Sequence, residues 1–233
     1  FLTIISILIG ILFLTTCEVF SPGLGDKIDL DLPVVGIESH GNGDYVGGVI
    51  TLSGYATDDV GISNITVSHD NDSFVADYAG EEWSLVFDTS TYPDGDYEIT
   101  ISASDTSGKI ASLDMLLVVD NSPPSVLVTV PTDYGTDQDF NKFITIKGEA
   151  ADTTRVDQVF ISLYRSSDSS PVFVDEQATG SSSWYYIFDA EAYGGLLGNY
   201  YFNVRAVDPS GNSNSYFYHF EDVLGLAVDP GKT

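Results

Sequence analysis

The residues of this sequence that could bind a ligand together are those with oxygen-bearing side chains. Acidic and amide residues recur where segments of alternating polarity end, and five are candidate ligands: Asp94, Asp120, Asn121, Asp152 and Asp208. Calcium takes six to eight oxygen ligands of this kind. Aspartate in a turn also accepts hydrogen bonds from backbone N–H groups, with no metal present. Calcium is therefore the one cofactor that the sequence suggests, and turn capping is the alternative.

The other chemistry-bearing residues form no catalytic pattern. The three histidines, His40, His69 and His219, lie far apart, and none has a second histidine at metal-ligand spacing. The sequence contains no nucleophile elbow, zincin motif, P-loop or dinucleotide fingerprint. Glu81 and Glu82 are adjacent on a predicted strand, so their side chains point to opposite faces. We therefore expect no enzyme active site.

The chain is strongly acidic and rich enough in apolar residues to fold. Eight Lys and Arg stand against 35 Asp and Glu among 233 residues, which gives a formal net charge of −27. This charge repels phosphate backbones, so nucleic acid is not an expected partner. It favours solubility outside the cell and the retention of divalent cations. Hydrophobic residues make up 43% of the chain, enough for packed cores.

The N-terminal segment predicts export and lipid anchoring. Residues 1–16 (FLTIISILIGILFLTT) carry no charge and are fewer than the roughly 20 that span a bilayer, as in a signal peptide. The only cysteine, Cys17, follows at once, so no intramolecular disulfide can form. The segment Leu14-Thr15-Thr16-Cys17 resembles the lipobox of bacterial lipoproteins, which implies lipid on Cys17.

From this segment we predict a signal peptide over 1–17, a tether over 18–32, and attachment to a membrane through lipid, at the bacterial cell surface or outer membrane. An ordinary signal peptide, or an uncleaved anchor that contains a cysteine, is the alternative.

Three sequence blocks recur in the same order, which predicts two copies of one domain. The matched pairs are ITLSGYATDD (50–59) with ITIKGEAADT (144–153), WSLVFD (83–88) with WYYIFD (184–189), and GDYEITISASDTSGK (95–109) with GNYYFNVRAVDPSGN (198–212). We place domain 1 over 33–120 and domain 2 over 121–222. We expect residues 223–233 to be a tail or a linker to missing sequence.

Each copy has the pattern of a β-sandwich. Apolar and polar residues alternate along 97–104 (YEITISAS), as a half-buried strand requires. The segments 92–96 (YPDGD) and 105–108 (DTSG) have the composition of turns. The sequence therefore predicts an all-β chain with two tandem immunoglobulin-like sandwiches.

The repeated blocks resemble bacterial immunoglobulin-like modules of exported and cell-surface proteins. The resemblance rests on Gly-x-Ala-x-Asp, Trp-x-x-x-Phe-Asp and the Asp-Gly-x-Tyr block, and it covers about 33–220. It implies cores packed around Trp83 and Trp184, with Tyr97 and Tyr200 as corner tyrosines. In this fold the loops that carry Asp152 and Asp208 adjoin and face the domain junction, where a calcium site is expected.

One surface distinguishes domain 2 from domain 1. Residues that replace smaller or polar ones of domain 1 are expected to face outward on neighbouring strands: Phe160, Tyr164, Tyr201, Arg205 and Phe217. Aromatic residues with arginine are typical of an interaction hot spot. The partner would be a protein, a carbohydrate or a second copy of the chain. A register error of one residue would instead turn these side chains inward, and a neighbouring loop or domain would cover them.

These observations predict a non-catalytic bacterial surface lipoprotein that acts in adhesion, display or spacing. Two alternatives remain: the accessory region of a longer extracellular, carbohydrate-active enzyme, and a structural subunit of a surface layer or appendage. The fold alone does not separate them.

Overall fold

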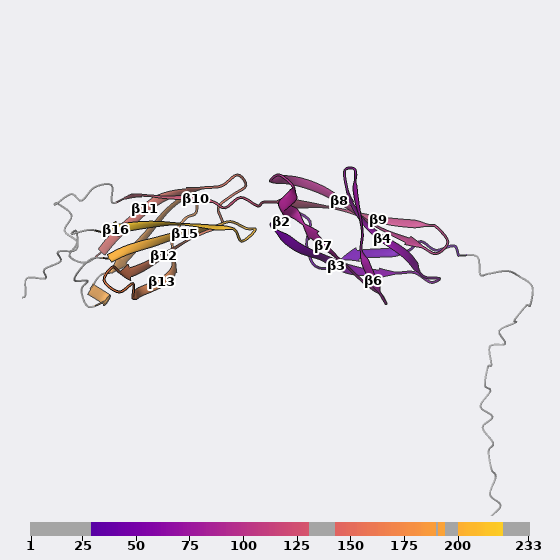
Figure 1. The fold of residues 1–233 in the computed structure, drawn as a ribbon, viewed down its shortest axis with the longest axis horizontal. Coiled ribbons are helices and arrows are strands. Elements are labelled where there is room, and N and C mark those ends of the chain that lie inside the picture. Colours follow the sequence, from indigo (N-terminus) through magenta and orange to yellow (C-terminus); the bar gives the residue numbers. More distant parts are fainter. Residues whose placement is uncertain (1–28, 131–142, 190, 194–199, 221–233) are drawn as a thin grey trace, which may run out of the picture. The chain divides into compact units, whose positions relative to one another are not determined.

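The computed structural model describes residues 29–130, 143–189, 191–193 and 200–220 (Figure 1). The predicted signal peptide with Cys17, most of the tether and the tail lie outside the described residues. No helix in the described ranges is long and apolar enough to cross a membrane. The regular structure of these ranges is β-strand with two short 3-10 helices, which confirms the predicted all-β class.

The first sandwich, here called module 1, contains nine strands and one 3-10 helix. They are β1 (Val34–Ile37), β2 (Asp44–Val46), β3 (Val49–Thr57), β4 (Ile62–His69), β5 (Asp72–Val75), β6 (Asp77–Ala79), β7 (Glu82–Asp88), η1 (Thr89–Thr91), β8 (Gly95–Asp105) and β9 (Ile110–Val119). One sheet has the order β1-β3-β7-β6 and the other β2-β9-β8-β4-β5. The strands pair antiparallel except β2 with β9, which pair in parallel.

The second sandwich, module 2, repeats this plan. Its elements are β10 (Ser125–Val130), β11 (Phe143–Ala151), β12 (Gln158–Arg165), β13 (Pro171–Gln177), β14 (Ser183–Asp189), η2 (Glu191–Tyr193), β15 (Tyr200–Val207) and β16 (Ser213–Phe220). The sheets are ordered β10-β11-β14 and β13-β12-β15-β16. Both modules belong to one compact unit, residues 31–233.

Each core is built around a tryptophan that faces a glycine on the adjacent strand. Trp83 pairs with Gly54 and Trp184 with Gly148, and both indoles are 2% exposed. A Cβ atom on Gly54 would overlap the carbonyl oxygen of Gly36. That same oxygen accepts a 3.0 Å hydrogen bond from Trp83 Nε1. Because glycine has no side chain, both β1 and the indole can pack closely against β3 at Gly54.

The predicted alternation of strand residues is largely confirmed. Along β15 every second residue is buried, beginning with Tyr200, and the same holds for β8 from Ile99 to Asp105. Tyr97 acts as a corner tyrosine, because its hydroxyl donates a 2.8 Å hydrogen bond to the Pro93 carbonyl four residues upstream.

Two residues of module 2 depart from the period of two. The repeat places Tyr216 over Leu113, which predicts an inward side chain, but Tyr216 is 38% exposed, because β16 lies at the edge of its sheet and is paired only with β15. The alternation predicts that Ser162, between Ile161 and Leu163, faces outward, but it is buried. Its hydroxyl accepts a hydrogen bond from the Asp175 backbone N–H, where Asp175 has a positive φ of 53° and the β12–β13 register shifts.

We predict that Gly54→Ala destabilises module 1 by about 1–3 kcal/mol, because the added methyl group must displace β1. This corresponds to a fall in melting temperature of roughly 4–20 °C for a domain of this size. Thr51→Ala is the matched control, because Thr51 is exposed on the same strand and its loss changes stability by no more than about 0.5 kcal/mol. Equal melting temperatures for the two variants in calorimetry would contradict the packing argument.

Candidate functional site

The side chain of Asn121 holds the start of the linker to module 1. Its Oδ1 accepts hydrogen bonds from the Gly48 N–H at 2.8 Å and the Thr89 hydroxyl at 3.1 Å. Its Nδ2 donates to the carbonyl oxygens of Thr89 at 2.9 Å and Tyr92 at 3.3 Å. Both lone pairs and both protons of the amide are therefore used within module 1.

Asp94 joins this arrangement from the turn before β8. Its Oδ1 accepts a 2.7 Å hydrogen bond from the Asn121 N–H, and its Oδ2 accepts a 3.3 Å bond from the Thr153 hydroxyl of module 2. The Asn121 N–H, with the hydroxyls of Ser122 and Thr153, holds the pKa of Asp94 below its ordinary value. Asp94 is therefore an ionised acceptor that connects the linker with both modules.

Three carboxylates converge on the module 2 side of the junction. Asp120 follows β9, Asp152 follows β11 and Asp208 follows β15. One oxygen from each lies within 4.8 Å of the other two, and Asp120 and Asp208 are 0% and 2% exposed. Burial raises the pKa of Asp120 above its ordinary value, and the negative charges of Asp152 and Asp208 raise it further. The site therefore brings three acidic side chains together, and two of them lie away from water.

Of the five predicted ligands, the structure brings together Asp120, Asp152 and Asp208. Asp94 is not a member of this group. The lone pairs of the Asn121 amide are already occupied by hydrogen bonds. Asp94 and Asn121 thus have structural partners of their own, and the reduced set of three carboxylates is the candidate cation site.

Sequence reasoning missed two polar residues at the junction. The Thr154 hydroxyl lies 2.5 Å from Asp120 Oδ2 and 3.0 Å from Asp152 Oδ1. Asn212 Nδ2 donates a 2.9 Å hydrogen bond to the Asp120 carbonyl. The repeat alignment could have identified Asn212, because the two copies differ there: the matched residue of domain 1 is Lys109.

The predicted partner face lies on the sheet of β12, β15 and β16, with its side chains outside the core. The Tyr164 and Tyr201 rings stack at 5.2 Å with an interplanar angle of 16°. The ring centroids of Tyr201 and Phe217 are 6.2 Å apart. The Arg205 guanidinium lies 4.8 Å from the Phe160 ring centroid and 3.1 Å from an Asp175 oxygen. Phe217 is 55% exposed.

The contacts within this face satisfy several of its members. Cross-strand ring pairs and the Arg205–Asp175 ion pair stabilise a sheet without any partner. The structure therefore brings the predicted residues together, with the expected register, but their role in binding stays a prediction.

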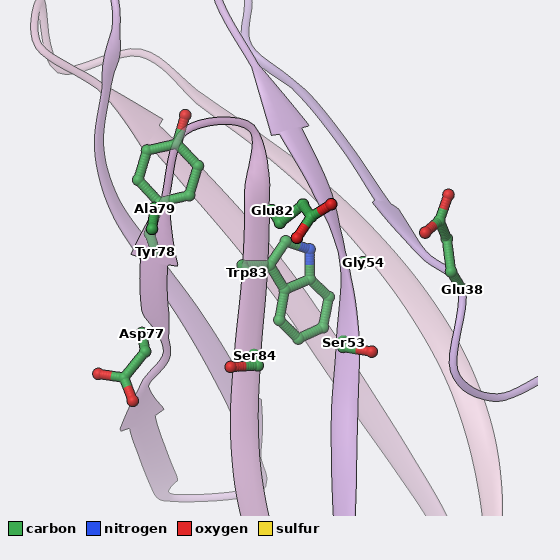
Figure 2. A pocket seen from close by; sticks show the side chains of 9 residues that line it. All are labelled: Glu38, Ser53, Gly54, Asp77, Tyr78, Ala79, Glu82, Trp83 and Ser84. Atoms are coloured by element: carbon green, nitrogen blue, oxygen red, sulfur yellow. The ribbon is translucent and has the colours of Figure 1, made fainter.

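A hollow of about 480 Å³ opens beside β3, β6 and β7 in module 1. Its acidic lining residues are Glu38, Asp77 and Glu82. Figure 2 shows that these three carboxylates lie apart and point in different directions. Most glycoside hydrolases use two carboxyl groups that flank the scissile bond. The hollow therefore gives no support to a catalytic pair.

One comparison with known protein families identifies the first of the two modules. A family model described as a bacterial Ig domain matches residues 33–101, within module 1. The predicted resemblance to bacterial immunoglobulin-like modules is thus confirmed. A search of curated protein sequences gave no match.

Several solved structures are similar to the chain. For the fibronectin(III)-like modules of Clostridium thermocellum CbhA, the identity is 18%, the coverage 80% of this chain and 92% of that one, and the TM-score 0.47. A structure of a 1.5-MDa bacterial ice-binding adhesin has 16% identity, and the match covers 80% of this chain and 63% of that one with a TM-score of 0.41. The endo-β-1,4-mannanase of Thermotoga petrophila has 16% identity, and the match covers 41% of this chain and 21% of that one with a TM-score of 0.37.

We predict that Asn121→Ala destabilises module 1 by about 1–3 kcal/mol, because it leaves part-buried N–H and carbonyl groups without their partner. Thermal unfolding followed by circular dichroism measures the effect. Asn71→Ala, the same change at an exposed turn residue, is the control and should leave the melting temperature within about 2 °C. An Asn121→Ala protein as stable as this control would show that the amide bonds do not hold the junction.

Proposed function

We propose that this chain is a non-catalytic bacterial surface lipoprotein in which two immunoglobulin-like modules form a stiff spacer, anchored through lipid on Cys17. One observation carries the proposal: the linker is bound into both modules through its own polar groups. Asn121 is hydrogen-bonded within module 1. Asp120 is bonded to Thr154 and Asn212 of module 2.

Further contacts across the junction support stiffness. The Arg155 guanidinium of module 2 lies 5.3 Å from the ring centroid of Tyr45 in module 1, and cation–π contacts of this kind contribute about 0.5–1 kcal/mol at exposed sites. The linker continues into Pro123 and Pro124. Proline fixes φ near −65° and favours extended chain, which restricts swivelling.

Spacing is favoured over adhesion because groups of both modules are hydrogen-bonded to the linker, whereas contacts within the sheet account for the aromatic face. The two alternatives, an accessory region of an extracellular enzyme and a structural subunit, would use the same stiff junction. They differ in what the remainder of the protein contributes. Non-catalytic spacing by this segment is common to all three.

Replacement of both prolines tests the stiffness. Pro123→Gly with Pro124→Gly frees two φ angles and should broaden the distribution of particle dimensions in small-angle scattering, while each module melts as before. Ser166→Gly with Ser167→Gly, in the exposed β12–β13 turn, is the matched control and should leave the profile unchanged. A wild-type profile that is already as broad as that of the proline variant would refute the stiff spacer.

Replacement of the cysteine tests the anchor. Cys17→Ser removes the acyl acceptor and should move the protein from the membrane fraction to the medium, because stable anchoring requires more than one acyl chain or an added signal. Ser21→Ala in the predicted tether is the control and should stay with the membrane. Mass spectrometry of the native protein should find lipid on an N-terminal Cys17, and an unmodified thiol there would overturn the anchor.

A further inference from the structure

The three junction carboxylates have the separation that one calcium ion requires. Ligand oxygens lie about 2.3–2.6 Å from Ca²⁺, so two oxygens on one ion are at most about 5 Å apart. Oxygens of Asp120, Asp152 and Asp208 all lie within 4.8 Å of one another. A single ion can therefore contact all three without a change of backbone.

A second observation points to a ligand between them. Asp208 Oδ1 accepts a 2.9 Å hydrogen bond from the Asn212 N–H, and Asp152 Oδ1 accepts a 2.8 Å bond from the Thr154 N–H. The other carboxylate oxygen of each residue, Oδ2, is buried and accepts no hydrogen bond. Asp208 as a whole is only 2% exposed. A buried oxygen without a donor is costly, and a cation is the natural partner for two such oxygens.

The hydroxyl of Thr154 cannot replace that cation. It lies within hydrogen-bond distance of Asp120 Oδ2 and Asp152 Oδ1, but its single proton can serve only one of them. No lysine or arginine of the described residues forms an ion pair with these three carboxylates. The cluster is thus left with three acidic groups and no basic one.

In module 1, the charge of the corresponding buried aspartate is balanced by a lysine. Asp105, which matches Asp208, is also 2% exposed, and its Oδ2 lies 3.4 Å from Lys109 Nζ. In module 2 the lysine is replaced by Asn212, which donates to the Asp120 carbonyl instead. The compensating charge inside module 1 is therefore absent from module 2, at the position where Asp120 and Asp152 add two further carboxylates.

We propose that Asp120, Asp152 and Asp208 bind one Ca²⁺ ion at the module junction. The all-oxygen donor set excludes the sulfur and imidazole ligands that favour zinc or copper, and Ca²⁺ accepts such irregular sites more readily than the octahedral Mg²⁺. The Thr154 hydroxyl and water supply the remaining oxygens. The calcium site is inferred from the geometry of the three carboxylates alone. Its role in fixing the junction rests on the proposed spacer function.

Calcium titration by calorimetry into the chelator-treated full chain in detergent tests the site. About 150 mM NaCl screens the diffuse acidic surface. We expect one ion per chain with a Kd of about 10⁻³ M or lower, as in extracellular modules, and a rise in melting temperature with added calcium. Asp208→Asn should raise the Kd at least about tenfold. Asp152→Asn, at a less buried position, should do the same and serves if Asp208→Asn does not fold.

Asp105→Asn is the matched control, because it changes the corresponding buried aspartate outside the cluster and should leave the Kd unchanged. Equal calcium affinity in wild type and Asp208→Asn would mean diffuse binding and would overturn the site. Equal affinity for Mg²⁺ would overturn the assignment to calcium. A narrow scattering profile without calcium binding overturns the site but supports the spacer, whereas calcium binding with a broad profile supports the site and overturns the spacer.

Discussion

The packing of one tryptophan against a glycine-bearing strand is the interaction on which each module depends. The chain has one cysteine, so no disulfide can join the two sheets of a sandwich. The indoles of Trp83 and Trp184 take that place, and each is opposed by a glycine. Each pair joins two neighbouring strands of one sheet, and its buried indole is part of the core between the sheets. The loops at the ends of the strands therefore have defined positions. The junction chemistry rests on those positions.

Much of the fold could be predicted because strand burial has a period of two. Residues such as Ile101 and Val204, on central strands, are fully buried as the alternation requires. Tyr216 departs from the pattern because an edge strand has a neighbour on one side only. Ser162 departs because a positive-φ residue, Asp175, turns the adjacent backbone onto it. Neither effect is encoded in the alternation of its own strand.

The candidate site could be predicted only in part. The convergence of Asp152 with Asp208 follows from topology, because the loops after the second and sixth strands adjoin in this fold. The roles of Asn121 and Asp94 do not follow from it. The four bonds of the Asn121 side chain reach two segments that are distant in sequence, at Gly48 and at Thr89–Tyr92. These contacts determine which oxygen lone pairs remain for a ligand. The spacing of residues along the sequence does not predict such contacts.

The two copies show how one scaffold acquires different chemistry at its ends. A buried aspartate at the start of the turn after β8 or β15 binds the backbone N–H four residues on, in both modules. That bond is a requirement of the turn and explains why the carboxylate is present at all. The residue at the end of the turn decides what becomes of its charge: Lys109 neutralises it within module 1, whereas Asn212 bonds the linker backbone. The side chain at this position thus determines whether the charge of the structural aspartate is balanced within its own turn or is left unbalanced beside other carboxylates.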